Sequence, residues 1–160
     1  MIATSANIRK VRPIAENVND DKRINPYIEE AEKLFVIPNI GASTYKAIAA
    51  DKMAFATLLD GGYYDDDKQY FSGLYEAIGY LAYSRFVRNQ PVNSTAFGIV
   101  AKQGQFSEQV DSKTLISVAN DAEKIGLQYL KECVDFLNFG KDRDQQRPFK
   151  GKRKFIAIGR

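Results

Sequence analysis

Apolar residues recur at every third or fourth position along most of the chain, which is the spacing of amphipathic helices. The clearest run begins at Ser107 or Ser112 and continues to residue 139. Its apolar positions are Leu115, Val118, Ala119, Ala122, Ile125, Tyr129, Cys133, Phe136 and Leu137. A second long run, over about residues 67–89, has the same spacing and carries four tyrosines that widen its apolar surface. We therefore expect two long central helices, the first contacting several neighbours and the second ending at Gly140 as a C-cap.

Shorter helices are expected in the first sixty residues. One covers about residues 4–15, with Thr4 or Ser5 as its N-cap. After a polar turn at residues 17–23, a second helix begins with Asn25 as N-cap and Pro26 in the first helical position. Its polar side chains are expected on the face away from the core: Glu29, Glu30, Glu32 and Lys33.

The second helix is expected to stop at residues 37–41, where Pro38 interrupts the pattern and Gly41 supplies a positive φ. A third helix then runs from Ser43 or Thr44 toward residue 59, with an interruption at Asp51. We expect this third helix to end at residues 60–62. The acidic run at residues 65–67 is interpreted as the capped, dipole-stabilised start of the long helix that follows.

Residues 97–105 depart from the helical pattern. After a predicted loop at residues 93–95, the β-prone run 97–101 indicates an extended arm or a hairpin. This excursion and the apolar run 155–159 lack an obvious partner strand, so they pair either with each other or with another chain. The expected fold is all-α: a four- to five-helix bundle with two long central helices, a short β-like excursion between them and an extended basic C-terminal tail.

Charge is distributed unevenly along the chain. The 160 residues hold 23 Lys and Arg against 20 Asp and Glu, a formal charge of +3. Residues 141–160 carry a formal charge of +6, so residues 1–140 carry −3. The sequence therefore divides into a helical domain at 1–140 and a basic partner-docking tail at 141–160.

Composition removes much of the catalytic repertoire. The chain has no His, which excludes imidazole bases and His-ligated metals. Its one cysteine, Cys133, lies in an apolar helical run and is interpreted as an inert core thiol. Neither glycine-containing segment, 39–43 or 60–62, matches a phosphate-binding loop, and residues 65–67 lack the spacing of a calcium loop. We expect no enzyme activity, no cofactor and no metal.

The tail provides the sharpest candidate site. Its partner-binding residues are predicted to be Arg147, Phe149, Lys150, Lys152, Arg153, Lys154, Phe155, Ile156 and Ile158. Three interpretations are open: docking on an acidic protein surface, binding of nucleic acid, and a merely solvated tail. The apolar residues 155–158 at the end of the tail favour docking on a protein, so we rank a protein partner first, nucleic acid second and a solvated tail third. Tyr63, Tyr64 and Tyr70 are either core residues or interface residues.

The N-terminus lacks the apolar stretch of a signal peptide, and no segment approaches the roughly 18 apolar residues of a membrane span. The expectation is a soluble protein that folds in a reducing cytoplasm, without a membrane partner.

The order of these segments resembles the small all-helical head–tail connector, or adaptor, proteins of tailed bacteriophages, including those of Bacteroides and crAss-like phages. Residues 24–45 (INPYIEEAEKLFVIPNIGASTY) resemble their opening, in which a helix reading I-x-x-A-E leads to a P-x-[LI]-G-x-x-x-[YF] corner. Residues 70–87 (YFSGLYEAIGYLAYSRFV) and 92–100 (VNSTAFGIV) resemble their central helix and the T-x-x-G-[IV]-V excursion.

The resemblance implies a structural virion protein. Such adaptors form a ring, usually of twelve copies, beneath the portal protein; the ring extends the channel for packaged DNA and carries the downstream stopper or tail proteins. It implies that the tail reaches the portal and that the excursion contacts ring neighbours through Phe97, Ile99, Val100 and Lys102. The protein would be made in the host cytoplasm and reside in the neck of the virion. The alternative is a small nucleic-acid-binding protein that acts through its basic tail.

Overall fold

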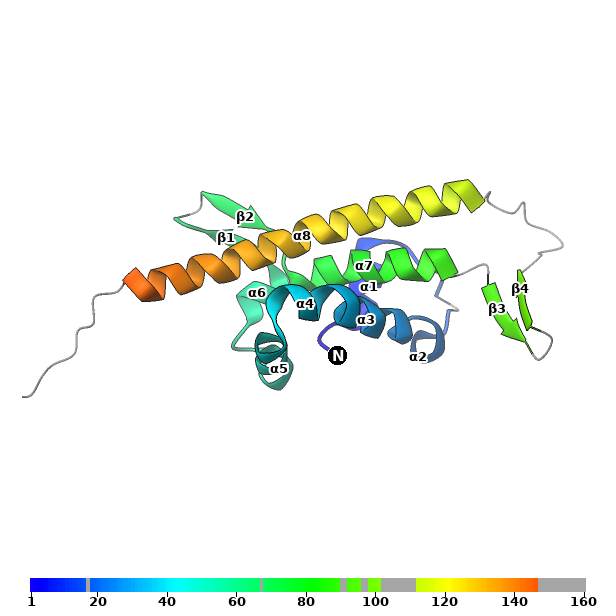
Figure 1. Ribbon diagram of the computed structural model, residues 1–160, viewed down its shortest axis with the longest axis horizontal. Helices are drawn as coiled ribbons and strands as arrows, with labels where there is room; N and C mark the ends of the chain where they lie inside the picture. The colour runs from blue at the N-terminus through cyan, green and yellow to red at the C-terminus, as the bar shows by residue number, and fades with distance from the viewer. Residues whose placement is uncertain (17, 67, 90–91, 96–97, 102–111, 147–160) are drawn as a thin grey trace, which may run out of the picture.

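In a computed structural model the chain is mostly helical, with small two-stranded hairpins, which confirms the helical class (Figure 1). The structure describes residues 1–16, 18–66, 68–89, 92–95, 98–101 and 112–146. The elements are α1 (Ser5–Val11), α2 (Asp20–Arg23), α3 (Asn25–Ala31), the π-helical η1 (Glu32–Val36), α4 (Ile37–Ile40), α5 (Ala42–Ala50), α6 (Ala56–Asp60), β1 (Gly62–Tyr64), β2 (Gln69–Phe71), α7 (Leu74–Asn89), β3 (Val92–Thr95), β4 (Gly98–Ala101) and α8 (Ser112–Gln146).

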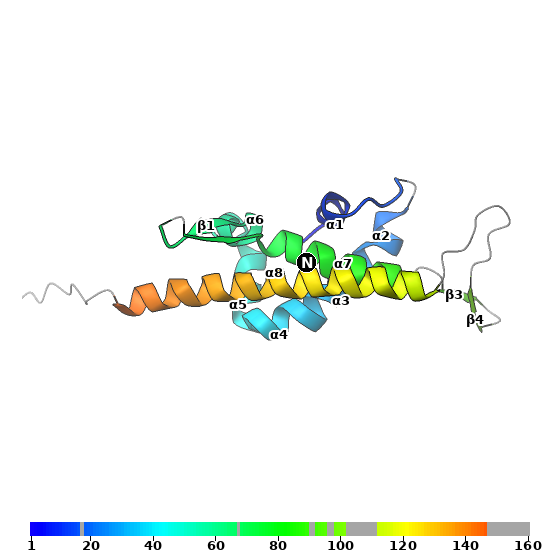
Figure 2. The same cartoon turned by 90° about the horizontal axis from the view of Figure 1, so that it is seen from above.

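The two long helices form the centre, as predicted. Helix α7 packs against α1, α3, α6 and α8, and Figures 1 and 2 show α8 lying along it and extending beyond the body at both ends. Gly126 of α8 lets the helices approach closely, because a Cβ there would lie 2.7 Å from Leu81 Cγ. Arg88 joins the helices farther along by donating to Asn120 and to Glu123, at 2.7 and 2.6 Å.

The ends of both long helices differ from prediction. Helix α7 starts at Leu74 because residues 62–71 form the β1–β2 hairpin, whose turn contains Asp65 and Asp66 at φ 55° and 53°. The acidic run is therefore a turn and not a helix cap. Helix α8 continues through Gly140 to Gln146, so the predicted C-cap is wrong. An exposed helical glycine costs only about 1 kcal/mol, which is too little to end a helix of this length.

The first sixty residues follow the prediction in part. Thr4 is the N-cap of α1, Gly41 ends α4 at φ 85°, and residues 51–55 separate α5 from α6 as expected. However, residues 20–23 are helical, and Ile24, not Asn25, occupies the N-cap of α3. Pro38 does not break the pattern: it lies in the first turn of α4, directly after the π-helical segment η1. That segment already departs from the i→i−4 ladder, so the missing N–H of proline is tolerated there.

A guanidinium organises the connection from α1 to α2. Arg9 donates to the carbonyls of Ile14 and Val18, at 2.9 and 3.1 Å, and to Asp20 Oδ1 at 2.7 Å. Asp20 Oδ2 accepts from Ser5 Oγ at 2.7 Å. The hydrogen bond from Arg9, followed by that from Ser5, holds the pKa of the Asp20 carboxyl below its usual value.

This arrangement predicts a loss of stability in acid. A carboxyl whose pKa is lower in the folded chain stabilises the fold above its unfolded pKa, and this contribution disappears as pH falls through the folded pKa. Asp20→Asn should therefore be less stable than the unsubstituted protein at pH 7, and the difference should shrink as pH falls below the ordinary Asp pKa of about 3.9. Urea unfolding of both proteins at pH 7 and below about pH 3.9 measures this difference in stability. A difference that stays constant with pH would contradict it.

Two glycines close the base of the β1–β2 hairpin. Gly61 and Gly73 have φ 81° and 86°, and a Cβ on Gly73 would lie 2.4 Å from the backbone nitrogen of Gly61. Gly73→Ala should destabilise the fold by at least about 1–3 kcal/mol, the cost of the left-handed φ alone. Gly140→Ala is the matched control, because nothing lies within 4 Å of its Cβ; it should stabilise by about 0.5–1 kcal/mol. Urea denaturation compares them, and equal effects would refute the close approach.

Candidate partner-binding surfaces

The predicted tail residues lie outside the described part of the chain, as do Phe97 and Lys102. Of the predicted excursion, Ile99 and Val100 lie in β4. Their partner strand is in the chain itself: β3 pairs antiparallel with β4, with Ser94 opposite Ile99 and Asn93 opposite Val100. The hairpin, one of the two forms predicted for this excursion, is therefore confirmed. The predictions of a loop at residues 93–95 and of a strand without a nearby partner are wrong. The hairpin lies beyond the ends of α7 and α8, away from the helical body (Figure 1).

The other hairpin, β1–β2, is fixed to α8 by aromatic rings. Phe71 is fully buried and stacks on Phe136, with ring centroids 4.4 Å apart. Tyr64 packs edge-on against Phe71, Phe136 and Phe139 at 5.8, 5.4 and 5.3 Å. Side chains alternate between the two faces of a strand, so this contact uses one face of the hairpin and leaves the other exposed.

The exposed face of β1–β2 carries two tyrosines, Tyr63 and Tyr70, which we call the outer tyrosine face. They are opposite each other in the strand register, and 65% and 57% of their surfaces are exposed. Their rings lie 5.1 Å apart. The prediction left these tyrosines between core and interface, and the structure places them on the surface. Tyr64 proves to be a packing residue. The turn-forming Asp pair between short aromatic runs is the sequence signal that indicates this hairpin.

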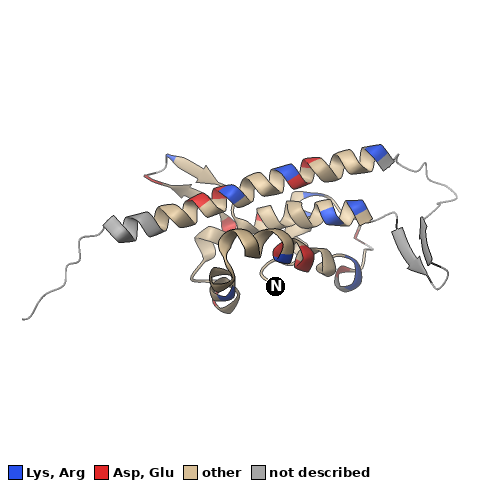
Figure 3. Cartoon of the chain, in the orientation of Figure 1, with Lys and Arg blue, Asp and Glu red and all other residues tan. Residues whose placement is uncertain are grey.

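Carboxylates surround this hairpin. Asp65 and Asp66 lie in its turn, and Glu132 and Asp135 lie on the adjoining part of α8 (Figure 3). Burial raises the pKa of Tyr64, and Asp135, Glu132 and Asp65 raise it further, in that order. Among the described residues, none of these four carboxylates forms an ion pair. These four carboxylates outnumber the two lysines of the hairpin turn and the adjoining helix, Lys68 and Lys131.

A buried carboxylate anchors the N-terminus. Glu32 is 1% exposed, although the helical pattern predicted it on the polar face. Its Oε1 accepts from the backbone N–H groups of Ile2 and Ala3 at 2.7 and 2.9 Å, and its Oε2 accepts from Tyr45 Oη at 2.6 Å. Burial and the hydrogen bond to Glu32 raise the pKa of Tyr45. Lys52 Nζ donates to the carbonyl of Ile2 at 2.7 Å. These contacts hold residues 1–3 against the core.

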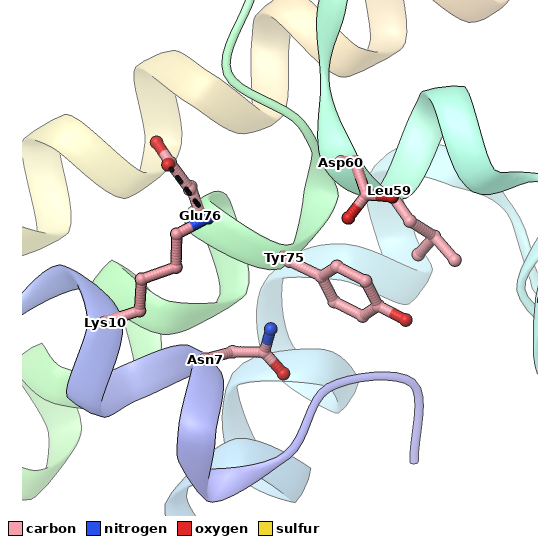
Figure 4. A pocket seen from close by; sticks show the side chains of 6 residues that line it. All are labelled: Asn7, Lys10, Leu59, Asp60, Tyr75 and Glu76. Atoms are coloured by element: carbon pink, nitrogen blue, oxygen red, sulfur yellow. Dashed lines mark ion pairs between the residues drawn. The ribbon is translucent and has the colours of Figure 1, made fainter.

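A small pocket lies between α1, α6 and α7 (Figure 4). It measures about 130 Å³, and its lining residues are Asn7, Lys10, Leu59, Asp60, Tyr75 and Glu76. Lys10 Nζ and Glu76 Oε1 lie 4.0 Å apart, and the Tyr75 ring lies between Asn7 and the end of α6. Burial raises the pKa of Tyr75. Ligand pockets usually measure about 300–1,000 Å³, so this one suits a few water molecules rather than a metabolite.

The described residues offer little for metal or thiol chemistry. Within the described residues, no cluster of three or more His, Cys, Asp or Glu is arranged to hold a metal ion. Cys133 is buried in the core, which confirms its interpretation as a core thiol, and burial raises its pKa to about 12. The reactive thiolate is therefore suppressed at neutral pH. No helix in the described ranges combines the length and the apolar character that crossing a membrane requires.

Comparison with known proteins gives a family without an assigned role. No curated protein and no solved structure matches the chain. A family match covers residues 36–143, from the end of η1 almost to the end of α8, and includes both hairpins and both long helices. The chain therefore belongs to DUF6712, a family of unknown function.

Proposed function

We propose that this protein is a structural virion protein: an adaptor that forms a ring beneath the portal of a tailed phage, joins head to tail and extends the DNA channel. Following the connector resemblance, the ring has twelve copies, and its partners are the portal protein, the downstream stopper or tail proteins and the passing DNA. The protein is made in the host cytoplasm and resides in the neck.

The observation that carries this proposal is the position of the two partner segments on α8. The β3–β4 hairpin lies near the N-terminal end of α8 (Figure 1). Residues 147–160 of the tail follow Gln146, at the opposite end of the helix. A helix of 35 residues separates these ends by about 52 Å. A subunit with separated ends suits a stacked assembly, because one end contacts ring neighbours while the other contacts the portal.

The outer surface of α8 supports lateral contacts. Ile116 and Leu127 are 54% and 41% exposed and lie eleven residues apart, which returns them to nearly the same side of the helix. Burial of these two apolar side chains against a neighbouring subunit would be favourable. We assign this stripe to the contact between adjacent ring subunits.

Removal of the tail tests the portal contact. Deleting residues 147–160 leaves α8 whole and is expected to abolish binding to the portal protein encoded in the same genome, while circular dichroism shows an intact helical body. The matched control is Ile116→Ser with Leu127→Ser, which should weaken ring assembly and leave binding of the tail to the portal in place. Full portal binding by the truncated chain would refute the assigned role of the tail.

The alternative function, a nucleic-acid-binding protein, is supported by the six basic residues between 147 and 160. If all six contact phosphates, the logarithm of affinity should fall against the logarithm of salt concentration with a slope of roughly −5. Fluorescence anisotropy with duplex DNA measures this slope. A steep slope for the full chain that flattens after the tail is deleted would favour this function, and binding that ignores salt would exclude it.

A further inference from the structure

The outer tyrosine face lacks a covering element in the described chain. Its reverse side is held on α8 by Phe71, Tyr64 and Phe136, so the face is rigidly presented rather than free to collapse into the core. Tyrosines offer large contact area at a small cost in side-chain entropy, and they are enriched where proteins bind one another. The face therefore has the properties of a docking surface, and its surroundings indicate what it binds.

The charges around this face favour a basic occupant. Asp65 and Asp66 lie in the turn at one end of the face and form no ion pair among the described residues. Glu132 and Asp135 lie on the reverse side of the hairpin, near Tyr64. Residues 65–68 of the turn comprise three Asp and one Lys, so the turn carries a formal charge of −2. Tyrosine rings also attract Lys and Arg through their negative faces, by about 0.5–1 kcal/mol at exposed sites.

The chain contains such a segment close by. Residues 147–160 carry six Lys or Arg, no acid, and two phenylalanines. They follow Gln146, seven residues after Phe139, whose ring packs on Tyr64. Seven helical residues span about 10 Å, whereas the fourteen residues 147–160 reach up to about 46 Å when extended. Figures 1 and 2 show the hairpin and the C-terminal part of α8 at the same end of the molecule.

We propose that residues 147–160 dock on the outer tyrosine face of their own chain, with Lys and Arg side chains over Tyr63 and Tyr70 and beside the carboxylates of the turn. Because the tail is tethered near the site, its effective concentration there is in the millimolar range, which favours this contact over one with a second copy in dilute solution. A docked tail is withheld from other partners until one of them displaces it. The docking itself does not rest on the proposed function.

Paramagnetic relaxation enhancement, in which a nitroxide broadens the NMR signals of nearby residues, tests this contact in the full chain. Because Cys133 is buried, an Arg160→Cys variant can be labelled selectively with a nitroxide at its new thiol. The amide signals of residues 62–71 are expected to broaden and to recover when the nitroxide is reduced. The broadening should disappear at about 1 M salt, where the Debye length is about 3 Å.

Two substitutions identify the binding groups. Asp65→Asn with Asp66→Asn removes the turn charges while keeping residues that tolerate positive φ, and Tyr63→Ser with Tyr70→Ser removes the rings; each should reduce the broadening. Glu16→Gln with Glu29→Gln removes two charges elsewhere and should leave it unchanged. Undiminished broadening in the Asn pair would overturn the proposal. The proposal would also be overturned by equal broadening in a mixture in which some chains carry only the isotope and the others only the nitroxide. In that mixture only contact between two copies broadens the signals. Neither result bears on portal binding, which the truncated chain tests separately.

Discussion

Replacing Glu32 with leucine is expected to destabilise the fold by on the order of 3–5 kcal/mol. The side chain is buried and accepts hydrogen bonds from the N–H groups of Ile2 and Ala3 and from the hydroxyl of Tyr45. Each donor left buried without an acceptor costs about 1–3 kcal/mol. If the N-terminus instead leaves the core to rehydrate its amides, the burial of Ile2 is lost, at about 1.5–3 kcal/mol.

Urea unfolding measures this effect, and two variants separate its causes. Glu32→Gln keeps an acceptor for the two amides and should lose clearly less stability than Glu32→Leu. Glu29→Leu changes an exposed residue of the same helical segment and should stay within about 0.5 kcal/mol of the unsubstituted protein. If Glu32→Leu proved as stable as Glu29→Leu, the carboxylate would not be the anchor of the N-terminus.

Phe71→Ala is the second substitution with a large expected effect, about 3–5 kcal/mol. Phe71 is fully buried, stacks on Phe136 and meets Tyr64 edge-on, so its removal leaves a cavity between the hairpin and α8. Alanine cannot replace these ring contacts. We also expect the hairpin amides to lose protection from hydrogen exchange, because the aromatic cluster is what fixes β1–β2 to the helix.

The adjacent residue provides the control. Tyr70 precedes Phe71 on the same strand but points to the exposed face. Tyr70→Ala removes its cross-strand ring contact with Tyr63 and should lower the free energy of unfolding by no more than about 1 kcal/mol. Denaturant titration of both variants, with hydrogen exchange of the hairpin amides, makes the comparison. Similar losses for the two residues would contradict the assignment of an inner and an outer face.

The features predicted correctly are those determined by local sequence. The apolar periodicity indicates both long helices, and the interruption at Asp51 and the stop at Gly41 follow from capping and positive φ. Cys133 is buried as predicted because it lies in the apolar stripe of α8.

Features that depend on distant partners were predicted wrongly. Glu32 resembles a solvent-exposed acid in the helical pattern. Its burial is made favourable by the amides of residues 2 and 3, about thirty positions away, and by the hydroxyl of Tyr45. The strands of β1–β2 are three residues long and carry little periodic signal, so Asp65 and Asp66 resembled a helix cap. For the candidate site, the tyrosines could be named from the sequence, but the choice between core and surface required the packing of Phe71 on Phe136.

The central claim is that this chain is a ring subunit of a virion neck. A cryo-electron microscopy reconstruction of the neck, from particles of the phage whose genome encodes the chain, tests it most directly. We expect a ring of copies directly beneath the portal, with the residues after Gln146 against the portal and the stripe of Ile116 and Leu127 between neighbours. A complete neck reconstruction in which every ring is built from other chains would contradict it.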